Sequence, residues 1–198
     1  MLYHISMNKE QIIEAAKEYI KDVFKNNSGG HDKEHTIRVF NTALTIAKDY
    51  PECDLFIVSL ASLLHDVDDH KLFDNQNNEN ARKFLNKQSV PNEMVEHVCQ
   101  VINEVSFSKN KDKKPSSIEA MIVQDADRLD AMGAIGVART FAYGGQECRP
   151  LESSIKHFYD KLLLLKDKMN TETAKRIAEE RHQFLVSFLT EYNKETQQ

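Results

Sequence analysis

An apolar, helical segment over residues 60–71 ends in side chains that could bind a metal or move a proton. On a helix, His65 and Asp66 lie about 100° apart and Asp69 lies one turn beyond both, so all three can face one centre. A buried carboxylate next to a buried imidazole is costly unless a charged group lies between them. The pattern therefore predicts a divalent metal at this helix end.

Two further clusters could complete such a site. His31 and His35 stand four residues apart with acids between them, and Asp125, Asp127 and Asp130 follow a second apolar segment. Asp125 and Asp127 lie about 200° apart on a helix, so at most one of them faces a shared site, whereas Asp127 and Asp130 can share a face. A mixed set of imidazoles and carboxylates suits Mn²⁺, Fe²⁺ or Zn²⁺, and an all-oxygen set suits Mg²⁺ or Ca²⁺.

The elements expected to position these residues are helices. Apolar residues recur at three- and four-residue steps, and the chain has only six glycines and four prolines to interrupt them. The segments with this pattern are residues 8–25, 31–49, 52–67, 79–88, 92–105, 116–130, 153–168 and 171–194. Since no segment of useful length alternates as a strand would, the sequence predicts an all-α fold.

Three connecting segments carry more specific expectations. Ser116 and Glu119 form a Ser-x-x-Glu capping box, which predicts that a helix restarts there. Residues 133–138 are small and apolar, so we expect close packing between helices rather than phosphate binding, because the GxGxxG pattern is absent. Residues 108–116 are polar and basic, which favours a mobile surface loop and leaves open a basic flap over an anionic substrate.

Composition indicates a globular protein, with 40% hydrophobic and 29% charged residues, and the length suits a single domain over residues 1–198. The net charge of -5 argues against binding to a nucleic acid polymer but not against a nucleotide substrate. No apolar run reaches the roughly 18 residues of a membrane span, and no secretory signal is evident. Cys53, Cys99 and Cys148 lack disulfide or zinc spacing, so we expect reduced thiols and a cytoplasmic protein.

Three motifs in this order resemble those of the HD-domain superfamily of metal-dependent phosphohydrolases. They read GHDxxHxxRV at residues 30–39, LHDxxDxK at residues 64–71 and QDADRLDAxGA at residues 124–134. Their context looks like a branch of small, stand-alone bacterial hydrolases. The resemblance implies a compact helical bundle with an HD-like core at about residues 25–150 and a C-terminal helical extension at about residues 153–194.

The resemblance implies that the metal ligands are His35, His65, Asp66 and Asp127. Asp69 is placed to orient or deprotonate a water as general base, with a solvated carboxylate as the alternative.

Arg38, one turn from His35, and Lys71, just past the acidic cluster, are the leading phosphate contacts, and a surface role is the alternative for each. Weaker candidates, for which internal ion pairs are favoured, are Arg128, Arg139 and Arg149. His31 and Asp32 are expected either to contact the ligands of the site or to have a structural role, and Asp125 to cap a helix or form a salt bridge.

These expectations amount to a divalent-metal-dependent phosphohydrolase that cleaves a nucleotide or a related small phosphate ester with a metal-activated water. The ion is expected to be Mn, with Mg, Fe, Co or Ni as alternatives. Nucleoside triphosphates, with release of pyrophosphate, are preferred over phosphomonoesters and cyclic nucleotides. The alternative functions are a non-catalytic metal- or nucleotide-binding helical module and, more remotely, an HxxxH metalloprotease. The sequence leaves a homodimer open.

Overall fold

The computed structural model describes residues 8–25, 32–69, 73–74, 76–106, 110 and 113–196, and these residues form helices without a strand, which confirms the predicted all-α fold. In chain order the elements are α1 (Lys9–Val23), α2 (Lys33–Ala47), α3 (Leu55–Leu64), α4 (Glu79–Lys87), α5 (Asn92–Val105), α7 (Ile118–Asp130), α8 (Gly133–Gln146), α9 (Leu151–Asp160), the 3₁₀ helix η1 (Leu162–Lys168) and α10 (Glu172–Thr196). Among these helices, none has the length and apolar character that crossing a bilayer requires.

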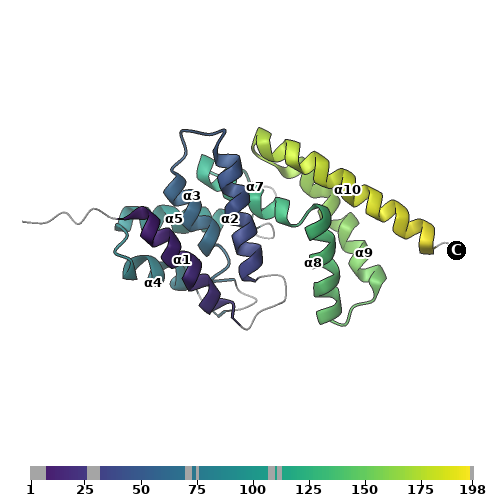
Figure 1. Ribbon diagram of the computed structural model, residues 1–198, viewed down its shortest axis with the longest axis horizontal. Helices are drawn as coiled ribbons and strands as arrows, with labels where there is room; N and C mark the ends of the chain where they lie inside the picture. The colour runs from purple at the N-terminus through teal and green to yellow at the C-terminus, as the bar shows by residue number, and fades with distance from the viewer. Residues whose placement is uncertain are drawn as a thin grey trace, which may run out of the picture.

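Helix α3 lies inside the group of helices that the N-terminal half of the chain forms. It packs against α1, α2, α5 and α7 (Figure 1). Every residue from Phe56 to Leu64 is buried, which explains why this helix is apolar on all sides rather than along one stripe. As a result, the chain delivers His65 and Asp66 directly from the core.

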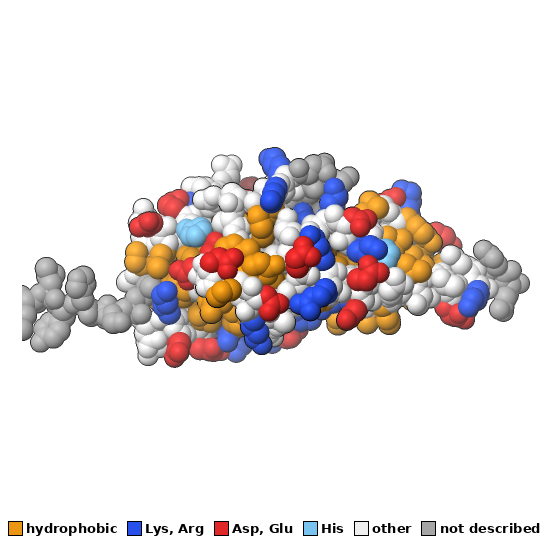
Figure 2. Space-filling view, turned by 90° about the horizontal axis from the view of Figure 1, so that it is seen from above, with side chains coloured by type: hydrophobic (Ala, Val, Ile, Leu, Met, Phe, Trp, Pro, Cys, Tyr) orange, Lys and Arg blue, Asp and Glu red, His pale blue; other side chains and the backbone are white. Residues whose placement is uncertain are grey.

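Helices α8, α9 and α10, together with η1, form a second group (Figure 1). Helix α10 packs against α8, η1 and α7, so α7 contacts both groups. The rings of Phe158 and Phe188 stack with centroids 5.5 Å apart, and Phe141 lies 5.8 Å from Phe188. On the face in Figure 2, acidic and basic side chains are interspersed, with apolar patches between them.

Two predicted helical segments differ from the structure. Helix α3 begins at Leu55, with Asp54 as its N-cap, rather than at residue 52. It ends at Leu64 rather than at Val67, because the N–H of Val67 bonds to a carbonyl three residues back, in a turn. The segment predicted as one helix over residues 153–168 consists of α9 and η1, and the break falls at Lys161. In η1 the buried leucines Leu162 and Leu165 stand three residues apart, which is the period of a 3₁₀ helix.

The predicted capping box is wrong in detail. The N-cap of α7 is Ser117, whose hydroxyl accepts the N–H of Ala120. Ser116 instead bonds to Glu104, and the Glu119 carboxylate accepts a backbone N–H from Asp54 at 2.9 Å. Both side chains serve contacts between helices rather than the local cap, which a local pattern does not reveal.

Close packing is confirmed for Gly133 and Gly136 of α8, but not for the whole segment of residues 133–138. Gly136 and Gly144 are buried, and a Cβ at Gly136 would lie 2.3 Å from the carbonyl oxygen of Ala131. Gly133 has a φ of +67°, a conformation that favours glycine. By contrast, Ile135 is 42% exposed, so one face of α8 points to solvent.

Candidate metal centre

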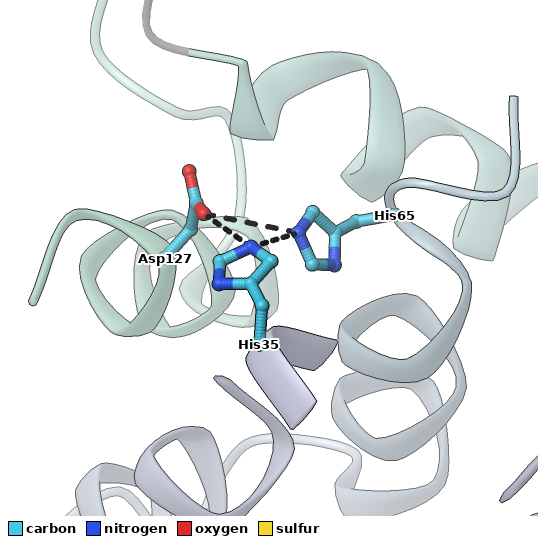
Figure 3. A group of neighbouring side chains, drawn as sticks. All are labelled: His35, His65 and Asp127. Carbon is cyan, nitrogen blue, oxygen red and sulfur yellow. Dashed lines mark hydrogen bonds and ion pairs between the residues drawn. The ribbon is translucent and has the colours of Figure 1, made fainter. Parts of the chain in front are cut away.

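Three predicted ligands meet where α2, α3 and α7 converge (Figure 3). His35 lies in the first turn of α2, His65 follows the last residue of α3, and Asp127 lies near the end of α7. The Nε2 atoms of the two histidines are 3.3 Å apart, and Asp127 Oδ1 lies 3.3 Å from His35 Nε2 and 3.8 Å from His65 Nε2. One ligand atom from each residue therefore points to a common centre.

Asp66, the fourth predicted ligand, lies beside these three residues. Its Oδ2 lies 3.4 Å from His35 Nε2 and 3.3 Å from His65 Nε2. The side chains of His35, His65 and Asp66 are at most 9% exposed, whereas that of Asp127 is 24% exposed. The four groups that the sequence predicted to act together thus lie together, and solvent reaches them on the Asp127 side.

The spacing of these atoms fits a divalent ion. Two ligand atoms about 2.1 Å from one metal lie roughly 3.0 Å apart at a right angle and roughly 3.4 Å apart at the tetrahedral angle. The measured separations to the histidine Nε2 atoms run from 3.3 to 3.8 Å. Two imidazole nitrogens and two carboxylates also form a donor set that transition metals accept.

The other nitrogen of each imidazole fixes which tautomer faces the centre. His65 Nδ1 lies 2.9 Å from the carbonyl oxygen of Ser62, and His35 Nδ1 lies 2.7 Å from Asp130 Oδ2. A carbonyl and a carboxylate can only accept, so both Nδ1 atoms donate. In the neutral ring this leaves the lone pair on Nε2, the atom that faces the centre.

The electrostatics of the cluster favour positive charge at this point. Burial by itself lowers the pKa of His35, but the carboxylates of Asp127, Asp130 and Asp66 outweigh it and raise that pKa well above its usual range. Burial also lowers the pKa of His65, but the charge and hydrogen bond of Asp66 and the charge of Asp127 together outweigh it and raise that pKa. Burial raises the pKa of Asp127, yet the two histidines bring it below its ordinary value. The site therefore attracts a cation or a proton.

Asp130 has a larger role at the site than the sequence indicated. Its carboxylate accepts the Nδ1–H of His35, two hydrogen bonds from Arg38 at 2.7 and 3.0 Å, and one from Arg139 at 2.7 Å. The sequence signal was the i, i+3 spacing of Asp130 from Asp127, which puts both on one face of α7. The partners of Asp130 on α2 could not be read from that spacing.

Of the remaining predicted site residues, Arg38 and Asp69 lie within the described part of the chain. The guanidinium group of Arg38 forms an ion pair with the Asp130 carboxylate, and its role as a phosphate contact stays a prediction. Asp69 is half-buried in the turn after α3, where its N–H bonds to the carbonyl oxygen of Asp66 at 3.1 Å, and its role as a base stays a prediction. Lys71 and His31 lie outside the described residues.

Two acids that lie two residues from a predicted ligand in the sequence have structural partners instead. Asp68 accepts the N–H groups of Asn80 and Ala81 at 2.8 and 3.0 Å and thereby caps α4. Asp125, for which the sequence predicted a cap or a salt bridge, accepts the N–H of Thr171 at 2.8 Å directly before α10. These contacts anchor α4 and α10 to the segments that carry the metal-binding side chains.

The chain resembles known proteins over nearly its whole length. The family model of the HD domain matches residues 33–132. The uncharacterized protein YpgQ of Bacillus subtilis (strain 168) is 39% identical over an alignment 190 residues long, which covers 92% of this chain and 92% of that protein.

Solved structures are also similar to this chain over nearly its whole length. The crystal structure of Bacillus subtilis YpgQ in complex with ADP has a TM-score of 0.82 at 35% identity and covers 94% of this chain and 96% of that one. That of an HD-superfamily hydrolase from Bacillus thuringiensis has a TM-score of 0.78 at 38% identity and covers 96% and 98%. This chain belongs to the HD domain family.

Proposed function

We propose that this chain is a divalent-metal-dependent phosphohydrolase that acts on a nucleotide. The observation that carries this proposal is the convergence of two imidazole nitrogens and two carboxylates, with separations of 3.3 to 3.8 Å from the histidine nitrogens, at a point that solvent reaches. A structural neighbour described as an HD-superfamily hydrolase supports the reaction class. The ADP complex of YpgQ supports a nucleotide as the substrate.

His35, His65, Asp66 and Asp127 would hold the ion. When bound, a divalent ion lowers the pKa of a coordinated water and withdraws charge from a phosphoryl oxygen. The chain's own task is to orient both imidazoles with Nε2 toward the ion, which the acceptors at their Nδ1 atoms achieve. We infer Mn²⁺ as the preferred ion, with Mg²⁺, Fe²⁺, Co²⁺ and Ni²⁺ as alternatives.

Asp69 is the residue proposed to take the proton. Its position in the turn after Asp66 puts it next to the metal-binding doublet. In the proposed reaction, the water oxygen bonds to phosphorus, its proton passes to the Asp69 carboxylate, and the phosphorus–oxygen bond to the leaving group breaks. With a nucleoside triphosphate attacked at the α-phosphorus, the products are a nucleoside monophosphate and pyrophosphate. Arg38 and Lys71 are the proposed contacts to the phosphates.

A release assay tests this proposal. Purified protein is incubated with nucleoside mono-, di- and triphosphates and with cyclic nucleotides, in the presence of Mn²⁺, Mg²⁺, Co²⁺ or Ni²⁺ in turn. Phosphate and pyrophosphate are measured separately. We expect pyrophosphate from triphosphates with at least one of these metals, and loss of the activity in the Asp127→Asn variant. A metal-loaded protein that binds ADP but releases neither product would instead support a non-catalytic binding module.

A further inference from the structure

Four side chains from three helices form a cluster on the far side of His35 from the metal centre. These residues, which we name the Asp130 cluster, are His35 and Arg38 on α2, Asp130 on α7 and Arg139 on α8. Asp130 lies between the other three and its side chain is only 5% exposed, whereas those of Arg38 and Arg139 are 33% and 24% exposed. The carboxylate is thus enclosed and the guanidinium groups reach toward solvent.

Both oxygens of the Asp130 carboxylate accept hydrogen bonds. Oδ1 accepts Arg38 Nε at 2.7 Å. Oδ2 accepts His35 Nδ1 at 2.7 Å, an Arg38 guanidinium N–H at 3.0 Å and an Arg139 N–H at 2.7 Å. Because the bidentate contact of Arg38 fixes the plane of the carboxylate, Oδ2 is held at the position where it meets the imidazole.

The two arginines also hold the carboxylate as an acceptor. Arg38 and Arg139 donate three hydrogen bonds to its two oxygens, beside the one from His35, and a guanidinium group can only donate. Asp130 therefore stays an acceptor, and an acceptor at Nδ1 requires the His35 proton on Nδ1 and the lone pair on Nε2.

We propose that Asp130 is a positioning residue that locks His35 in its metal-binding tautomer and orientation, with Arg38 and Arg139 holding the Asp130 carboxylate in place. The inference rests on the metal centre of the proposed function. His35 is the ligand for which this support matters most, since it comes from the first turn of a helix and has to address Asp66, Asp127 and His65 at once. A ring free to rotate or to change tautomer would turn a donor N–H toward the ion.

The Asp130→Asn substitution tests this role with little change in shape. An amide has one acceptor oxygen, so its NH₂ group must face either Arg38 Nε or the donors at the Oδ2 position. Asp125→Asn is the matched control. Asp125 is also a buried carboxylate on α7 that accepts several hydrogen bonds, but its partners are Asn170 and Thr171.

The measurement is the affinity for Mn²⁺ alone, by titration calorimetry on wild-type and both variant proteins, each checked for folding by circular dichroism. We expect Asp130→Asn to weaken Mn²⁺ binding about 10- to 100-fold, as loss of a hydrogen-bond partner of a ligating histidine commonly does. Asp125→Asn should lower the melting temperature without this loss of affinity. Equal affinities in wild-type and Asp130→Asn protein, or equal losses in the two variants, would overturn the role of Asp130 and leave the metal centre intact. A wild-type protein that binds no Mn²⁺ would refute the metal centre itself.

A second measurement serves if Asp130→Asn does not fold. Zn²⁺ is diamagnetic, so nitrogen-15 NMR of histidine-labelled wild-type protein in its presence reports which His35 nitrogen carries the proton. We expect a proton on Nδ1 that exchanges slowly with solvent. A His35 ring protonated on Nε2 would overturn the proposal.

Discussion

Asp66 and Asp68 stand two residues apart, yet their side chains meet different partners, and replacing each by alanine exposes the difference. Asp68 accepts the N–H groups of Asn80 and Ala81 at 2.8 and 3.0 Å, in the first turn of α4. The N-cap residue of that helix, Asn78, makes no side-chain capping bond of its own. Asp66 instead lies 3.3 Å from His65 Nε2 in the metal centre.

The expected cost follows from these contacts. Loss of an N-cap acceptor destabilises a protein by about 0.5–2 kcal/mol. Since Asp68→Ala deprives two N–H groups of a charged acceptor in a half-buried place, we expect the upper part of that range, about 1–2 kcal/mol. Metal affinity should be almost unchanged, because the Asp68 carboxylate is directed at α4.

Two assays separate the variants. Urea unfolding without added metal gives the free energy of unfolding, and calorimetric titration with Mn²⁺ gives the dissociation constant. Asp68→Ala should lower the free energy of unfolding and leave the dissociation constant for Mn²⁺ almost unchanged. Asp66→Ala should raise the dissociation constant more than about 100-fold, since even partners of ligands change affinity by 10- to 100-fold. An Asp68→Ala protein of unchanged stability, or one that loses Mn²⁺ as Asp66→Ala does, would refute this division of roles.

Other substitutions test the proposed base and the packing of α8. Asp69→Asn should keep its metal content by elemental analysis while turnover falls about 10²- to 10⁴-fold, and unchanged turnover would remove its role as base. Gly144→Ala should cost about 1–3 kcal/mol in urea unfolding, because the new Cβ would lie 2.4 Å from Ser154 Oγ. Adding Ser154→Ala should restore most of the loss, since the nearest remaining Ser154 atom is 3.7 Å away; no recovery would contradict that contact. Gly145→Ala, with no atom within 4 Å, is the control and should stabilise α8 by up to about 1 kcal/mol.

The sequence predicted the parts of the site that depend on local patterns. His65 and Asp66 were predicted because an apolar run ends in them, and α3 is apolar because neighbours cover it on all sides. Helical geometry alone predicted that Asp125 and Asp127 lie on different faces of their helix. The all-α class followed from periodicity, which is a property of each segment by itself.

What the sequence could not predict depends on partners far along the chain. Asp130 meets Arg38 across 92 residues, and Asp68 caps a helix that begins beyond a polar loop. Glu119 binds the backbone of Asp54 rather than closing a capping box, because α3 begins beside it. The break at Lys161 likewise reflects which leucines the surrounding helices bury.

The proposed function depends on the binding of one divalent metal ion by His35, His65, Asp66 and Asp127. Crystals soaked in Mn²⁺ and measured at the manganese absorption edge test this binding, because anomalous scattering locates the ion without reference to activity. We expect an anomalous peak about 2.0–2.3 Å from His35 Nε2, His65 Nε2 and an oxygen of each aspartate. Crystals with an anomalous peak elsewhere and none at this point would contradict it.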